Sequence, residues 1–355
     1  MKICVTGKGL CMEGSQRNNC VDILRIVSAF CIITLHNFSG SGHPFGEELT
    51  AMARFAVPLF FMISGYFAAS FDRPRRVRQI KKLLFLTLAS NLGYFLYRLW
   101  EATIGHNLPG FFAEKFAPKA FLDFFLLGES SVASHLWFLS ALLYVVILDH
   151  LLLSRLQSLK RGRAIVAAIA VVLLAAGLLY YHINTTILQK ELPWQNYRNF
   201  LLMGMPFYLF GKLLRDGKLT RIKLNVPVFL VLLVVLFGVC LCEYRLLGTK
   251  EIYLSSIVTA FLLLIFAVQH PMEQPGKVVS ALATAGRKYA LSVYVVHIFM
   301  LDKVRQVYFS FVQWGMYKPG FYFIPLITLL LSLLAAWVYA GEMSAAVNRL
   351  VNRSK

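Results

Sequence analysis

The feature that most constrains this chain is a series of apolar windows, each long enough to cross a bilayer as a helix. About 30 Å of hydrocarbon requires ~20 mostly apolar residues in an α-helix. Ten such windows occur at 21–39, 49–71, 80–103, 133–153, 162–182, 197–214, 225–242, 251–270, 287–308 and 320–342. We therefore predict an all-α, polytopic membrane protein with about ten transmembrane helices. These helices would form a single domain over 21–342, between an N-terminal tail at 1–20 and a C-terminal tail at 343–355.

The net charge of +19 is arranged as membrane orientation requires. The chain is 58% hydrophobic and only 15% charged, with a mean hydropathy of +0.64, and it carries no nucleic-acid-binding motif. Alternating the segments between windows puts both tails on one side, together with 72–82, 154–163, 212–223 and 271–288. That side holds more than twice as many Lys and Arg as the other. The positive-inside rule then predicts cytoplasmic termini. We expect a multi-pass protein of the bacterial inner (cell) membrane, surrounded by membrane lipids.

The first window carries three ionisable side chains on one helical face. Arg25 and His36 are eleven residues apart, which is three turns plus roughly 20°, or about 16 Å along the axis. Asp22 lies one turn before Arg25, close enough to pair with it. Ionisable groups at membrane depth are costly and usually face a protein interior or a water-filled cavity. We predict that this face contributes to a functional site.

Four segments resemble motifs of the acyltransferase-3 family of integral membrane acyltransferases. Arg25, ten intervening residues and His36 resemble the family's R-x10-H signature. Residues 57–66 end in Ser-Gly-Tyr and are similar to the family's second-span pattern. Residues 135–139 (HLWFL) and 290–297 (ALSVYVVH) resemble two later segments. Because the matches follow the family's order along most of the chain, the sequence is identified as a member of this family.

The resemblance implies transfer of an acyl group, with acetyl expected, from acyl-CoA to a hydroxyl of a cell-surface or lipid-linked glycan. His36, Arg25 and Asp22 are then the expected catalytic residues. An imidazole is suited to deprotonating a hydroxyl and reprotonating a leaving thiolate. The sequence leaves open whether His36 acts as a general base or transiently carries the acyl group. Acetyl-CoA or another acyl-CoA would be the donor substrate, and we expect neither a permanently bound cofactor nor a metal site.

The basic segment 72–82 fits the family's R-x-x-R element in two registers, Arg73 with Arg76 and Arg75 with Arg78. In the family this element is linked to use of the acyl donor. Guanidinium forks suit the phosphates of acyl-CoA. The alternative is a cluster that only sets orientation and contacts anionic lipid headgroups. The sequence does not choose between the two registers.

Five further residues are candidates for substrate contact: His297, Tyr294, His135, Trp137 and Arg54. The resemblance puts the first two beside the active cavity, although a histidine in a helix can simply bond its neighbour. His135 and Trp137 open the fourth window at the predicted outer face, where Trp is also an ordinary interfacial anchor. Arg54 either snorkels to the interface or faces the polar cavity beside the first helix. The phenylalanine-rich segment 104–132 is predicted to be an interfacial or re-entrant element that caps the site.

A second hypothesis is a transporter or exporter of a glycan or small metabolite, since intramembrane charges also mark translocation paths. The lack of a clear inverted repeat or of paired broken helices argues against it, and a purely structural role leaves the charged face of the first helix unexplained. Any second step on the glycan would need a separate glycan-biosynthesis protein, because no hydrolase-like domain follows the tenth window. The first twenty residues lack a signal-peptide pattern, and either Met1 or Met12 can be the start.

Overall fold

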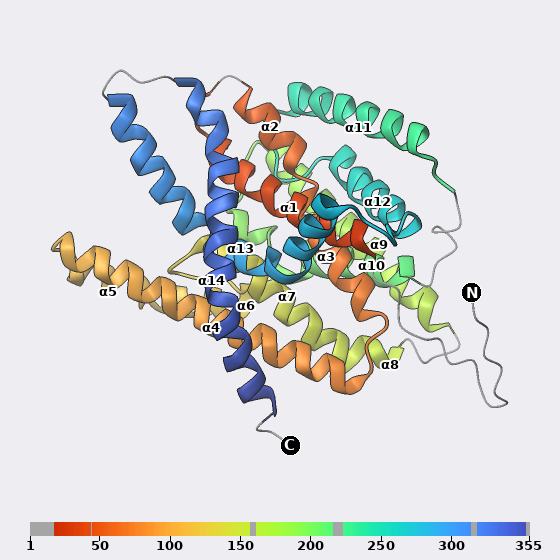
Figure 1. The fold of residues 1–355 in the computed structure, drawn as a ribbon, viewed down its shortest axis with the longest axis horizontal. Coiled ribbons are helices and arrows are strands. Elements are labelled where there is room, and N and C mark those ends of the chain that lie inside the picture. The colour runs from red at the N-terminus through yellow and green to blue at the C-terminus, as the bar shows by residue number, and fades with distance from the viewer. Residues whose placement is uncertain (1–17, 44, 157–160, 216–222, 314–317, 353–355) are drawn as a thin grey trace.

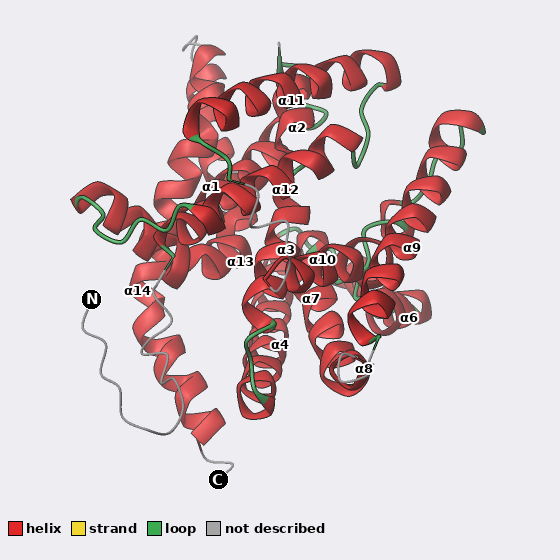
Figure 2. Ribbon diagram, turned by 90° about the vertical axis from the view of Figure 1, so that its right-hand side faces the viewer, coloured by secondary structure: helices red, strands yellow, loops and turns green. Residues whose placement is uncertain are grey.

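The computed structural model describes residues 18–43, 45–156, 161–215, 223–313 and 318–352 (Figure 1). These ranges are helical with connecting turns and contain no strand (Figure 2). The α-helices are α1 Asn19–Phe38, α2 Gly46–Ala53, α3 Ala56–Ala68, α4 Arg73–Ile104, α5 Leu108–Lys115, α6 Pro118–Leu127, α7 Trp137–Leu148, α8 Ser154–Leu156, α9 Gly162–His182, α10 Met205–Arg215, α11 Val226–Leu247, α12 Leu254–Gln269, α13 Lys277–Gln313 and α14 Ile324–Asn352. The all-α prediction is confirmed for the described part of the chain.

In the described part of the chain, six helical segments are long and apolar enough to cross a membrane. They are Asn19–Phe38, Gly46–Ala68, Ser134–Leu153, Gly162–Ile187, Val226–Leu247 and Pro319–Tyr339. The other four predicted windows also form helices: α12 is apolar but has only 16 residues, and α4, α10 and α13 are not among the six. Six spans are therefore supported by length and composition, whereas the count of ten remains a prediction.

The basic segment 72–82 is helical and not a loop. Asp72 caps α4, because its side chain accepts a 2.9 Å hydrogen bond from the backbone N–H of Arg75, and Pro74 occupies the first turn. Arg and Lys are good helix formers, so nothing interrupts the helix before the apolar part begins. The first turns of α4 consequently present the basic side chains along a helix.

The structure describes little of the predicted N-terminal tail and most of the predicted C-terminal tail. The predicted N-terminal tail 1–20 lies almost entirely outside the described residues, as does the choice between Met1 and Met12. At the other end, α14 continues to Asn352, so most of the segment predicted as a tail is helical. Residues 353–355 lie outside the described part.

Helix α1 is the centre of the packing and lies against α13, α3, α2, α14 and α12. A second close pair, α3 and α10, crosses at two reciprocal glycines. A Cβ at Gly65 would overlap the backbone carbonyl of Tyr208, and one at Gly211 would overlap that of Met62. Small residues of this kind let helix backbones approach closely in membrane proteins. The second apolar window thus packs through its Ser-Gly motif.

A buried ion pair ties the end of α7 to α10. Asp149 begins a π-helical turn after α7, where it pairs with Lys212 and accepts a 3.0 Å hydrogen bond from the Tyr208 hydroxyl. The Asp149 and Lys212 side chains are each only 1% exposed. Removing one partner of such a pair leaves an uncompensated buried charge, which is strongly destabilising.

Candidate functional site

Three histidines from distant parts of the chain meet in the interior. His36 is in the last turn of α1, His135 is in the short 3-10 turn before α7, and His297 is in the middle of α13. The ring centroids of His36 and His297 are 5.3 Å apart, and those of His135 and His297 are 5.2 Å apart. The packing of α1 against α13 brings the first and last of them together. The structure therefore places three sequence-predicted site residues in one cluster.

Backbone carbonyls hold two of these rings. His135 Nε2 lies 3.1 Å from the carbonyl oxygen of Val295, and His297 Nδ1 lies 2.6 Å from that of Tyr294. A carbonyl only accepts hydrogen bonds, so each of these nitrogens carries the hydrogen, which assigns the tautomer of a neutral ring. The Tyr294 hydroxyl in turn donates to the carbonyl of His135.

His36 differs from the other two histidines because no described residue hydrogen-bonds to its ring. It borders two cavities. One, which we call the histidine cavity, has a volume of about 290 Å³ and is also lined by Ser134, His135, Trp137 and Tyr294. The other, the α5–α6 cavity, has a volume of about 750 Å³. A half-buried imidazole with free ring nitrogens at this junction can exchange protons with a molecule in either cavity.

The histidine cavity also contains a charged group that sequence reasoning found only in part. Arg54 Nη1 and Arg198 Nε lie 2.9 and 2.6 Å from the same oxygen, Oε2 of Glu251. All three side chains line the cavity with His36. The group has a net charge of +1, and Arg54 Nε has no hydrogen-bond partner in the described structure. Of the two readings of Arg54, the structure supports the one in which it faces the cavity.

An interruption between two helices explains the orientation of Arg54. The second apolar window is not one continuous helix, because α2 ends at Ala53 and α3 begins at Ala56. Arg54 is the C-cap of α2, between the two helices, and its side chain is 9% exposed. Arg198 and Glu251 were missed because they stand at the starts of the predicted windows 197–214 and 251–270, where a lone charge looks like an ordinary interfacial residue. In the structure both lie in connecting segments.

The α5–α6 cavity is covered by the phenylalanine-rich segment, which forms α5 and α6. Its lining mixes Phe111 with the charged residues Arg98, Lys119 and Asp123. Burial raises the pKa of Glu129 above its ordinary value, although Gln195 donates a 2.8 Å hydrogen bond to its carboxylate. A roomy cavity with alternating charges and hydroxyls suits a polar, hydroxyl-rich ligand.

Arg25 and Asp22 do not join the histidines, although they were predicted as part of the same catalytic group. Along α1, Arg25 lies about 16 Å and Asp22 about 21 Å from His36, and both line a pocket of about 450 Å³ with Arg215 and Arg287. Asp22 pairs with Arg25 at 3.1 Å and with Arg287 at 3.3 Å. We call this site the arginine pocket. Helix geometry alone separates Arg25 from His36, since a shared face does not mean a shared site.

Aromatic rings pack against the cations of the arginine pocket. The guanidinium of Arg25 lies 4.6 Å from the ring centroid of Phe67, and that of Arg215 lies 5.1 Å from that of Tyr66. Three cations face one carboxylate, which leaves a positive excess suited to an anionic ligand.

The four arginines of the 73–78 cluster line none of these pockets. Arg73, Arg75 and Arg78 are exposed. Arg76 donates a 3.0 Å hydrogen bond from Nε to the carbonyl of Phe71, a residue in the wall of the arginine pocket. Among the described residues, no group of His, Cys, Asp or Glu side chains is arranged to hold a metal ion.

Comparison with known proteins assigns the chain to a family. Residues 18–340 match the acyltransferase domain of the acyltransferase-3 family. Part of the chain is similar to an amino-acid racemase from Enterococcus faecalis, at 35% identity over 100 residues, which is 25% of this chain and 14% of the racemase. Another part-length relative is a serine/alanine racemase from Enterococcus gallinarum, at 30% identity over 140 residues, which is 36% of this chain and 18% of that protein.

The chain spans less than a fifth of the length of either racemase, so these two similarities concern only a part of each. No solved structure matches the chain. The family match, in contrast, extends over nearly the whole sequence and includes both ends of the Arg25–His36 helix. This protein belongs to the acyltransferase-3 family of membrane acyltransferases.

Proposed function

We propose that this protein transfers an acyl group, acetyl in the first instance, from acyl-CoA to a hydroxyl of a cell-surface or lipid-linked glycan. The observation that carries the proposal is the position of His36. Its ring borders both cavities, and no described residue hydrogen-bonds to it. The neighbouring His135 and His297 are each held by a backbone carbonyl. His36 is the histidine of the cluster with neither ring nitrogen bonded to a described residue, and we assign the proton transfer to it.

The reaction needs a base and later an acid at one place. His36 takes the proton of the glycan hydroxyl, whose oxygen attacks the thioester carbonyl carbon. The carbon–sulfur bond breaks, and the proton passes to the leaving CoA thiolate. In the alternative route a His36 ring nitrogen attacks the thioester carbonyl carbon, the carbon–sulfur bond breaks and the CoA thiolate leaves with the proton of the imidazole. The glycan hydroxyl oxygen then takes the acyl group from His36, and its proton returns to the imidazole. Arg54 borders the same cavity and supplies a fixed cation for the oxyanion or for the acceptor.

The acyl donor would bind from the cytosolic end of α1. The arginine pocket offers three guanidinium groups for the phosphates of CoA. An extended pantetheine arm would then reach roughly 16 Å along α1 to His36. The 73–78 cluster would contribute at the pocket's edge through Arg76, which bonds the carbonyl of Phe71. In this arrangement the donor and acceptor approach His36 from opposite sides.

The α5–α6 cavity is the proposed acceptor site. His135 lines both this cavity and the histidine cavity, and Tyr294 and Trp137 line the histidine cavity. His297 packs behind them, with its ring against those of His36 and His135. We further propose the inner bacterial membrane, ten spans and cytoplasmic termini. Any later modification of the glycan would fall to separate glycan-biosynthesis proteins.

The deciding experiment uses purified protein in detergent with radiolabelled acetyl-CoA and candidate glycans. His36→Ala should lower turnover by about 10²- to 10⁴-fold, the usual contribution of a general acid–base group. His182→Ala is the matched control, because His182 on α9 lines none of the cavities described above. A folded His36→Ala protein that acylates glycan at the parent rate would remove His36 from the chemistry. Glycan uptake into proteoliposomes without any consumption of the donor would instead support a transporter.

A further inference from the structure

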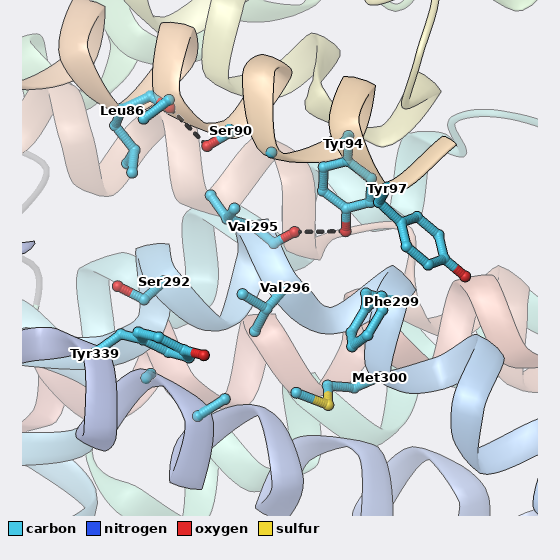
Figure 3. Close-up of a pocket in the computed structure, with 14 residues that line it drawn as sticks. Leu86, Ser90, Tyr94, Tyr97, Ser292, Val295, Val296, Phe299, Met300 and Tyr339 are labelled. Atoms are coloured by element: carbon cyan, nitrogen blue, oxygen red, sulfur yellow. Dashed lines mark hydrogen bonds between the residues drawn. The ribbon is translucent and has the colours of Figure 1, made fainter. Parts of the chain in front are cut away.

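A large apolar groove lies between α4, α13 and α14, outside the site described so far. Figure 3 shows residues that line it. Its volume is about 690 Å³. It is lined mainly by aliphatic and aromatic side chains, and the hydroxyl of Ser90 in its wall is already bonded to the carbonyl of Leu86 at 2.6 Å. A groove with this lining suits an apolar ligand, because it offers few polar groups that could bind a sugar or a phosphate.

The groove is separated from the histidine cluster by a thin wall. Tyr94 lines both the groove and the α5–α6 cavity. Its hydroxyl donates a 2.9 Å hydrogen bond to the carbonyl of Val295, as Figure 3 shows, and His135 Nε2 bonds the same carbonyl. One side chain and one peptide group therefore divide the groove from the proposed acceptor site.

The two ends of the groove differ in their surroundings. Along α4 it extends from Leu86 to Tyr97, a helical distance of about 16 Å. Tyr97 and Phe299 lie together at one end (Figure 3), and Arg98, the next residue after Tyr97, lines the α5–α6 cavity. At that end the apolar groove therefore lies beside the polar α5–α6 cavity. An elongated molecule with a hydrocarbon chain and a polar head matches an apolar groove that adjoins a polar cavity.

We propose that the groove holds the hydrocarbon tail of a lipid-linked acceptor, whose glycan end passes Tyr94 into the α5–α6 cavity. The inference rests on the proposed function and narrows its acceptor class to molecules that arrive from within the membrane. Tail burial then supplies binding energy remote from the reacting hydroxyl, and it positions the glycan beside His36.

Gly93 provides a direct test, because it lines the groove and a side chain there meets open space. Gly93→Leu should block the tail without disturbing the fold. Gly238→Leu is the matched control, since Gly238 is also an exposed helical glycine with open space around it, on α11. The acceptor sugar of the wild type is offered on farnesyl diphosphate and, separately, as its methyl glycoside.

We expect Gly93→Leu to lower kcat/KM for the farnesyl-linked acceptor by at least about tenfold and to leave the methyl glycoside unchanged. Gly238→Leu should change neither. Equal losses with both acceptors, or no loss with either, would overturn the proposal.

A binding measurement separates this inference from the proposed function. Farnesyl phosphate with a terminal diazirine should label peptides of α4 and α13 in the wild type, and excess untagged farnesyl phosphate should prevent it. Gly93→Leu should lose this labelling and Gly238→Leu should retain it. Competition by phosphatidylglycerol as strong as that by farnesyl phosphate would mean an ordinary bilayer lipid and would overturn the assignment. Specific labelling of a protein that acylates no acceptor would refute the proposed function and leave the groove's ligand class standing.

Discussion

Arg305 on α13 donates hydrogen bonds from Nη2 to the backbone carbonyls of His36 and Asn37, at 2.8 and 2.7 Å. The last carbonyls of a helix have no partner within it, and a cation there also complements the helix dipole. Arg305 therefore holds the final turn of α1, from which the His36 side chain projects. The contact joins residues 269 positions apart, and nothing in the sequence pattern indicates it.

We predict that Arg305 positions His36. Arg305→Gln should lower kcat by roughly tenfold and leave the donor KM unchanged, because two charge-assisted hydrogen bonds of ~1.5–3 kcal/mol each are weakened at the proposed base. Arg305→Lys should recover part of the loss. Gln306→Ala, an exposed change one residue along α13, is the control. A rise in donor KM with constant kcat would contradict the positioning role.

The cavity-facing cation Arg54 should matter for the acceptor. Arg54→Gln leaves Arg198 as the sole cation on Glu251 and removes the unpartnered Nε, so we expect acceptor KM to rise by about tenfold. Steady-state kinetics with varied acceptor at saturating donor would measure this. Arg245→Gln is the matched change, since Arg245 pairs with Glu48 at the surface and its side chain is 69% exposed. Equal effects of the two substitutions would show a general charge effect.

The donor site can be assigned by comparing two pairs of arginines. The double change Arg215→Gln and Arg287→Gln should raise the apparent KM for acyl-CoA by tenfold or more, because these guanidinium groups are confined in the arginine pocket. Arg73→Gln with Arg75→Gln should raise it less, since both side chains are exposed. A larger rise in KM from the second pair would assign the donor site to the R-x-x-R cluster instead. Loss of membrane insertion would show that the second pair only sets orientation.

The α3–α10 crossing should be sensitive to a single methyl group. Gly211→Ala forces a Cβ onto the carbonyl of Met62, and such overpacking typically costs about 1–3 kcal/mol. Thermal unfolding in detergent should show the loss. Gly238→Ala, where the new Cβ meets open space, should be neutral or slightly stabilising. Similar melting temperatures for the two variants would mean that the helices separate easily.

The proposed orientation is tested by reporter fusions. A reporter after residue 82 or residue 223 should be cytoplasmic, and one near residue 120 should be external, because the basic segments remain inside. An active cytoplasmic reporter near residue 120 would reverse the sides assigned to donor and acceptor. Reporters placed in each of the remaining segments between windows would decide which of the ten predicted windows cross the bilayer.

Local sequence determined the helical class, the apolar windows and the family, because each depends on patterns within one segment. Ionisable residues in an apolar window have few acceptable environments, so Arg25, His36 and His297 were identified as candidates without a fold. The glycines of α3 and α10 were equally visible as types of residue. The residues against which they pack could not be read from the sequence.

Only the tertiary structure decided which of these residues share a site. The packing of α1 on α13 brings His297 beside His36 and leaves Arg25 in a separate pocket with Arg287. Glu251 and Arg198 entered the site because two loops distant in sequence fold onto the break between α2 and α3. A helix fixes the spacing of its own side chains, but the neighbours of those side chains depend on helix packing, which single-segment patterns do not encode.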